Sequence, residues 1–135
     1  MDGTTEFEKF VMEFEQNATF NRDYQRIIAA LQAILRIGAL ERFFRPEGSM
    51  GDNVQALPIE SGRLRLYCLR LSDQIVILGN GGVKNTRTYE EDPKLYGYVL
   101  DLQKFEKILN ESIARKYVKI EEKDLSGIEN MSFEI

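Results

Sequence analysis

The stretch Arg63–Tyr89, RLRLYCLRLSDQIVILGNGGVKNTRTY, decides the fold of this chain. Its first part, Arg63–Leu71, is rich in Leu and Arg, and Gln74–Leu78 is a short apolar run with two Ile and one Val. Both runs have the length and composition of strands. Because only Ser72 and Asp73 separate them, the sequence predicts a tight hairpin of antiparallel strands. The glycines of Gly79–Gly82 then predict a sharp turn after the second strand.

Charge is distributed unevenly along the chain. Residues 61–89 contain five cations and one anion, a net charge of +4, whereas residues 1–60 and 90–135 each carry a net charge of −4. A basic hairpin in an acidic protein, with Tyr67 and Tyr89 in or beside it, is typical of a surface that binds a polyanion. The alternative is that its Arg residues are solvated side chains on the outer face of a half-buried sheet.

Length and composition indicate one globular domain spanning residues 1–135. The 135 residues are 43% hydrophobic and 30% charged, which is ordinary for a water-soluble domain with one core. No apolar run approaches the roughly 20 residues of a membrane helix, and the N-terminus is polar and acidic, so we expect no membrane contact. A single cysteine, Cys68, cannot form an internal disulfide, so we expect a cytoplasmic protein with Cys68 in the core rather than as a nucleophile.

The chain contains no histidine, which restricts the chemistry available to it. Ser-His-Asp and Cys-His catalysis are excluded, and zinc or another transition metal lacks its usual ligands. The acidic residues are scattered, so we expect no metal and no cofactor. The loop Gly79–Thr86 matches neither the Walker A nor the GxGxxG pattern, which favours a bend over a nucleotide site.

Two amphipathic helices are predicted before the hairpin. Thr5 and Glu8 have the spacing of a capping box, and an apolar stripe follows: Phe7, Phe10, Val11 and Phe14. Asn21 is the expected cap of a second helix, with Asp23 in its first turn and Gly38 at its end. We expect this helical hairpin to cover one face of the sheet; the alternative for the Phe stripe is a surface that binds a partner.

The remaining segments complete an α+β pattern. Val54–Ile59 is expected to be a short strand, residues 102–117 a C-terminal helix and residues 117–121 a small strand. Residues 124–135 are expected to be a loosely held tail. Grouped strands flanked by helices predict an N-terminal helical hairpin packed on a small antiparallel sheet, with a C-terminal helix.

Part of this pattern resembles the RelE/HigB-like toxins of type II toxin–antitoxin systems, in the RelE/ParE superfamily. The similar residues are RLRLYC at Arg63–Cys68, IVILG at Ile75–Gly79, and the following Val83 and Lys84. In that family two helices precede an Arg-bearing strand, which leads to an apolar strand and a loop containing Lys. The resemblance covers about residues 24–93.

The resemblance implies a RelE-like fold and a metal-independent, ribosome-dependent mRNA interferase that a separate antitoxin neutralises. By position it implies that Arg65 and Lys84 are catalytic, and Arg87 and Tyr89 join them as catalytic candidates because they are close in the chain. It also implies that Arg63, Arg65, Lys84 and Arg87 bind RNA. Because Arg63 and Arg65 alternate on a strand, we expect both side chains on one face, with the other two cations gathered near them.

Two departures leave a second function open. Asn85 stands where the family usually has a second lysine, and the chain as a whole is acidic. The sequence therefore leaves open both an endoribonuclease and a non-catalytic module of the same fold that binds protein or nucleic acid. A third alternative is an interaction protein that docks a partner on its Phe-rich first helix.

Overall fold

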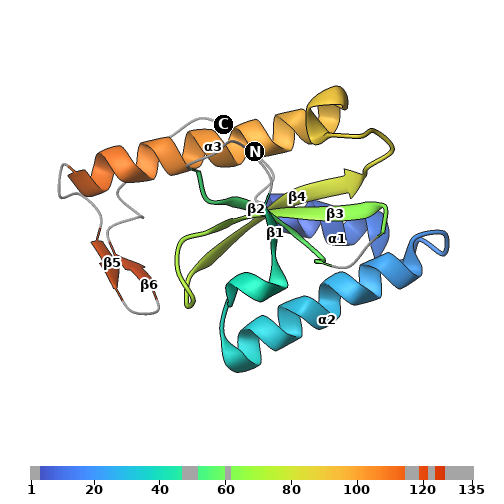
Figure 1. Ribbon diagram of the computed structural model, residues 1–135, viewed down its shortest axis with the longest axis horizontal. Coiled ribbons are helices and arrows are strands. Elements are labelled where there is room, and N and C mark those ends of the chain that lie inside the picture. The colour runs from blue at the N-terminus through green and yellow to red at the C-terminus, as the bar shows by residue number, and fades with distance from the viewer. Residues whose placement is uncertain (1–3, 47–51, 60–61, 115–118, 122–123, 127–135) are drawn as a thin grey trace.

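The computed structural model describes residues 4–46, 52–59, 62–114, 119–121 and 124–126 (Figure 1). Its helices are α1 (Glu6–Phe14), α2 (Asn21–Ile37) and α3 (Pro93–Ala114), with short 3-10 turns η1 (Glu41–Phe43) and η2 (Tyr89–Glu91). Its strands are β1 (Arg45–Pro46), β2 (Val54–Leu57), β3 (Leu64–Arg70), β4 (Val76–Val83), β5 (Lys119–Glu121) and β6 (Asp124–Ser126). The first four strands form one antiparallel sheet in the order β1-β2-β3-β4. The α+β class is confirmed.

The sheet has helices on both faces (Figure 1). On β3, Leu64, Leu66 and Cys68 pack with α1 and α2, whereas Tyr67 and Leu69 pack with α3. The predicted contact of the helical hairpin with the sheet is confirmed. Phe10, Phe14 and Ile27 are buried there, and Phe7, Ile28, Leu31 and Ile34 pack against them. Because both faces of β3 are covered, this strand is buried along nearly its whole length.

The caps of the first two helices follow the sequence only in part. Thr5 Oγ1 accepts a hydrogen bond from Glu8 N at 3.0 Å, so the predicted cap of α1 is confirmed. The predicted Asn21 cap is wrong, because Asn21 is already helical and Asn17 Oδ1 accepts from the backbone of Thr19 and Phe20 instead. Gly38 ends α2 with φ of +104°, as its position predicted.

The turn between β3 and β4 is longer than the predicted two residues. Leu71 N and Ser72 N both donate to Ile75 O, and Ser72 Oγ accepts from the backbone N of Gln74 and of Ile75. The Ser72 hydroxyl therefore organises a wider turn, and β4 begins at Val76. The predicted antiparallel pairing is confirmed, with Leu69 opposite Ile77.

The prediction that Gly79–Gly82 forms a turn is wrong, because these residues lie within β4. Leu66 pairs with Gly81 and Cys68 pairs with Leu78, so β4 carries one extra residue, a β-bulge, opposite Tyr67. A Cβ on Gly81 would lie 1.8 Å from the Arg65 carbonyl oxygen. Gly81 therefore allows β3 and β4 to approach each other closely and does not form a turn.

The C-terminal helix begins earlier than predicted, at Pro93. Asp92 Oδ1 accepts from the backbone N of Lys94 at 2.9 Å and of Leu95 at 3.2 Å, which caps α3. Lys119–Glu121 is a strand, as predicted, and pairs with β6, so residues 124–126 of the predicted tail are extended. Residues 127–135 of that tail lie outside the described residues. Within the described ranges, no helix is long and apolar enough to cross a membrane.

Candidate nucleic-acid interface

The first residue after β4 lies beside the last residue before β3. Leu64 pairs with Val83 at this end of the sheet, and Lys84 N donates to Arg63 O at 2.7 Å. We call the residues Arg63, Lys84, Asn85 and Arg87 the open end of the hairpin, in contrast to the turn that joins β3 to β4. Two of the expected site residues, Arg63 and Lys84, are therefore backbone neighbours.

Arg63 is exposed but held in place from two sides. Its guanidinium donates to Asn85 Oδ1, and its Cζ lies 5.6 Å from the centroid of the Phe20 ring, a cation–π contact. Asp23, in the first turn of α2, accepts from the backbone N of Arg63 at 2.8 Å and of Leu64 at 3.1 Å. The N-terminal end of α2 thus fixes the start of β3 and presents a positioned cation to solvent.

Arg65 is placed differently from what the strand pattern predicted. Only 5% of the residue is exposed, and its Nη1 donates to the carbonyl oxygens of Gly62 at 2.6 Å and of Leu64 at 3.1 Å. It pairs with Gly82 on β4, on the face that α3 covers. Arg65 therefore neither reaches solvent with Arg63 nor lies on an open outer face of the sheet. It holds backbone at the base of the open end.

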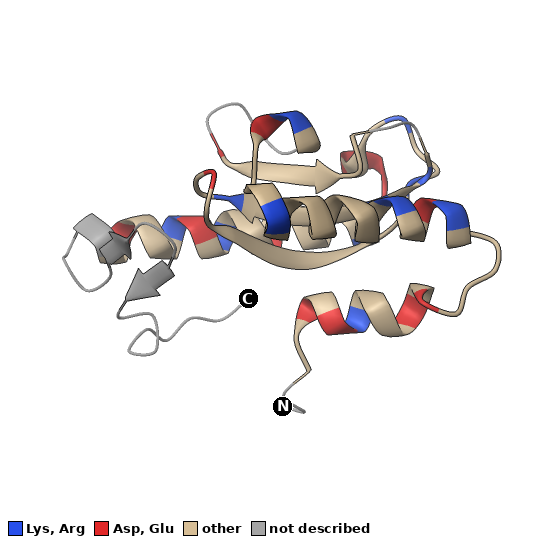
Figure 2. Ribbon diagram, turned by 90° about the horizontal axis from the view of Figure 1, so that it is seen from below, with Lys and Arg blue, Asp and Glu red and all other residues tan. Residues whose placement is uncertain are grey.

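The loop after β4 carries the other two expected cations. Lys84 is half-buried and Arg87 is exposed. Thr86 Oγ1 donates to Thr88 O, which closes the loop around Arg87. Within the described part of the chain, Arg87 forms no ion pair. Blue segments in the first turns of α2 and in this loop lie at the same end of the molecule (Figure 2).

Tyr89, the expected catalytic tyrosine, is 7% exposed and stacks on Tyr96. The ring centroids of Tyr89 and Tyr96 are 6.2 Å apart and the rings are inclined by 17°. Tyr96 lies in the first turn of α3 and is 41% exposed. Sequence reasoning missed Tyr96 because it started the helix too late. The pair Asp92-Pro93 is a helix-start signal that would have placed Tyr96 correctly.

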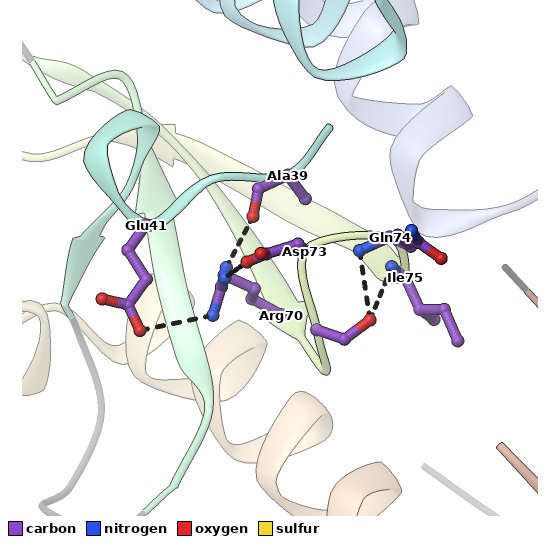
Figure 3. Close-up of polar contacts among 7 residues, drawn as sticks. Ala39, Glu41, Arg70, Asp73, Gln74 and Ile75 are labelled. Atoms are coloured by element: carbon purple, nitrogen blue, oxygen red, sulfur yellow. Dashed lines mark hydrogen bonds and ion pairs between the residues drawn. The ribbon is translucent and has the colours of Figure 1, made fainter. Parts of the chain in front are cut away.

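At the opposite end of the hairpin, other groups of the protein bind the side chain of Arg70 (Figure 3). Arg70 Nε donates to Ala39 O at 2.7 Å, its Nη2 donates to Asp73 Oδ1, and its Nη1 lies 3.7 Å from Glu41 Oε1. These contacts tie the segment after α2 to the turn of the hairpin. Arg70 is therefore a structural residue, and its charge does not add to a surface for polyanions.

A groove of about 770 Å³ lies beside that turn. Most of its lining is apolar and comes from the last turns of α2, the start of α1 and the first residues of β4. Its main apolar residues are Phe7, Leu31, Ile34, Leu35, Ile37, Val76 and Leu78. Leu35 is 88% exposed and Ile37 is 47% exposed, which is unusual for residues of this size. Sequence analysis did not predict this groove.

Two other expectations concern Cys68 and metals. Cys68 is fully buried, and burial raises the pKa of its thiol far above the ordinary value, so the core interpretation is confirmed. Among the described residues, no group of three or more Cys, Asp or Glu side chains has an arrangement that could hold a metal ion. Comparisons with family models, curated proteins and solved structures found no match to this chain.

Proposed function

We propose that this protein is a RelE/HigB-like, ribosome-dependent mRNA interferase that a separate antitoxin neutralises in the cytoplasm. The observation that carries the proposal is the open end of the hairpin. Arg63 and Lys84 are backbone neighbours there, and Arg87 follows in an exposed loop. Cations grouped beside the end of a paired hairpin are suited to RNA phosphates.

The chemistry proposed for this site needs no metal. The 2′-hydroxyl of a nucleotide gives its proton to a solvent water and attacks the adjacent phosphate. The bond from phosphorus to the 5′-oxygen of the next nucleotide breaks, that oxygen takes a proton from solvent, and a 2′,3′-cyclic phosphate remains. Lys84 and Arg87 stabilise the charge that develops on the phosphorane, because preorganised cations act most strongly where charge appears in the transition state. Arg63 holds a neighbouring phosphate.

Arg65 and Tyr89 take indirect roles in this proposal. Arg65 binds the carbonyl oxygens of Gly62 and Leu64 and so positions the backbone of Arg63 between them. Tyr89 is buried beneath α3 and supports the ring of Tyr96. We therefore assign transition-state contact to Lys84 and Arg87, and positioning to the two buried residues.

Cleavage of mRNA on programmed ribosomes tests the proposal. Wild type should cut, and Lys84→Ala should cut about 10²–10³-fold more slowly, with an unchanged melting temperature. The matched control is Lys107→Ala, which removes an exposed cation from the far half of α3 and should cut at the wild-type rate. Equal rates for all three proteins would contradict the assignment of Lys84. A folded wild type that never cuts would contradict the enzyme.

The apolar groove favours a second candidate function, a non-catalytic module that binds protein. Exposed Leu35 and Ile37 border a hollow lined by Phe7, Val76 and Leu78, and large exposed apolar patches commonly mark interfaces. This candidate predicts that Leu35→Glu abolishes complex formation with a small protein encoded beside this one. Lys84→Ala should leave that complex intact. Retained binding in Leu35→Glu would remove the groove from consideration.

A further inference from the structure

Tyr96 is an aromatic residue whose position on the surface needs an explanation. It is 41% exposed and is the one aromatic among the large hydrophobic side chains exposed in the described ranges. Tyr89 lies parallel to one side of its ring. The ring centroids are 6.2 Å apart, so the two nearly parallel rings are offset, and Tyr89 leaves part of the Tyr96 ring exposed.

The orientation of the Tyr96 ring is set before any ligand arrives. Tyr89 is 7% exposed and packs with Val54, Ala56 and Tyr67 against the sheet. Tyr96 N donates to Asp92 O at 2.8 Å in the capped first turn of α3. A ring that is already oriented loses little conformational entropy on binding, which favours affinity.

The surroundings of the ring suit an uncharged planar group next to a phosphate. Arg87 precedes Tyr89 by two residues, so its backbone lies within about 7 Å of the residue that supports the ring. Glu90 and Glu91 are exposed in the same turn, and they disfavour a phosphate over the ring itself. A nucleobase is planar and uncharged, and Arg87, two residues before the tyrosine that supports the ring, is the nearest loop cation along the chain for its phosphate.

We propose that the exposed part of the Tyr96 ring stacks on an unpaired base of single-stranded RNA whose phosphates bind Lys84 and Arg87. This inference rests on the proposed function and adds the residue that contacts a base. Stacking on an aromatic ring tolerates any base and contributes about 1–3 kcal/mol per base. Tyr96 therefore supplies affinity for single strands and does not by itself select a sequence.

The first measurement is the affinity for a single-stranded RNA decamer at low salt. Tyr96→Ala should weaken binding about 5- to 150-fold, which is the stacking contribution converted at 1.4 kcal/mol per tenfold. Tyr96→Phe should bind as wild type, because it retains the ring. Tyr96→Leu should keep the packing on Tyr89 and the melting temperature yet bind as weakly as Tyr96→Ala, which separates stacking from a structural role.

The second measurement uses fluorescence, because the chain contains no tryptophan. The decamer should quench the emission of Tyr96→Trp, whereas inorganic polyphosphate, which has no bases, should not. Met12→Trp is the matched control, since Met12 is 75% exposed on α1; its emission should change with neither probe.

Three results would overturn the inference, and they affect the proposed function differently. Wild-type affinity in Tyr96→Ala, or equal quenching by RNA and polyphosphate, would remove base stacking but leave the cleavage assay on ribosomes as the independent test of the enzyme. A wild type that binds no decamer at low salt would also overturn stacking. In that case, cleavage on ribosomes would still decide the proposed function.

Discussion

The two ends of the β3–β4 hairpin use the same residue types for opposite purposes. At the turn, Arg70 binds the Ala39 carbonyl and two carboxylates, and its side chain is only 14% exposed. At the open end, Arg63 contacts an amide and an aromatic ring, and neither contact neutralises its charge. What an Arg on this strand can bind is therefore decided by the groups that face it from other elements.

Arg65 lies between these two cases. Its backbone lies near the open end, yet its guanidinium donates to backbone carbonyls on the face of the sheet that α3 covers. An Arg count along the strand overestimates the basic surface, because Arg65 and Arg70 face inward. The comparison leaves Arg63 and Arg87 as exposed cations near the open end, with Lys84 half-buried between them.

The largest expected effect lies between the two ends, where β4 approaches Arg65 most closely. Gly81→Ala should lower the free energy of unfolding by about 3 kcal/mol or more, because its Cβ would overlap the Arg65 carbonyl oxygen. Urea denaturation measures the change. Gly97→Ala is the matched control: a Cβ there has no atom within 4 Å, and the helix should gain up to about 1 kcal/mol. Similar stabilities for both variants would refute the close approach.

The next prediction tests the comparison of the two ends directly. Arg70→Met should cost about 1–3 kcal/mol of stability, because it leaves the Ala39 carbonyl without its donor and Asp73 without its cation. Arg63→Met should change stability by less than about 0.5 kcal/mol, as an exposed position allows. Thermal unfolding of both variants provides the measurement. Equal losses would mean that the open end is also structural.

The salt dependence of RNA affinity should respond in the opposite way, with a change for a substitution at the open end and none for a substitution at the turn. Arg87→Gln should lower the slope of log affinity against log salt concentration by about 0.7–1, because one phosphate contact is lost. Arg70→Gln should leave that slope unchanged, since its guanidinium already binds Ala39 and Asp73. Titrations between 50 and 200 mM salt, a range chosen for its strong effect on phosphate contacts, provide the slopes. A slope that falls for Arg70→Gln would contradict the division between the ends.

The smallest expected effect concerns Asp101. Carboxylates beside Arg70 offset the burial of its charge, whereas the charges near Asp101 do not offset the burial of its carboxylate. Burial, and then the charge of Glu6, raise the pKa of Asp101 on α3, and Lys104 only partly offsets them. A carboxyl with a raised folded pKa stabilises the fold at low pH and loses that contribution as pH rises through the folded value. Asp101→Asn should therefore be slightly more stable at pH 7, by less than about 1 kcal/mol because the site is mostly solvated.

That stabilisation should disappear as pH falls toward the ordinary pKa of an aspartic acid. Melting temperatures of wild type and Asp101→Asn between pH 7 and pH 4 provide the measurement. Asn110→Ala, at an exposed position near the end of α3, is the control, because it changes no ionisable group and should show no such trend. A stability difference that stays constant across this range would mean that Asp101 does not titrate in it.

Short-range features of this protein followed from the sequence. The Thr5 cap of α1, the end of α2 at Gly38 and the apolar stripes of both helices depend on residues within one or two turns of each other. The antiparallel pairing of β3 with β4 likewise follows from two strand-like runs close together in the chain. These features are local, so composition and spacing were enough to predict them.

The tertiary structure decided the rest, because the deciding groups come from distant parts of the chain. Glycine is needed at position 81 of β4 because a Cβ there would overlap the Arg65 carbonyl oxygen, and at position 79 a Cβ would lie only 3.2 Å from Leu102 of α3. Arg65 turned inward because α3 covers its face of the sheet, and Arg70 because the segment after α2 supplies Ala39 and Glu41. The residue pattern of one strand does not show which elements pack on that strand. The sequence therefore indicated a basic hairpin, and only the packing of the helices on the sheet determined which cations face solvent.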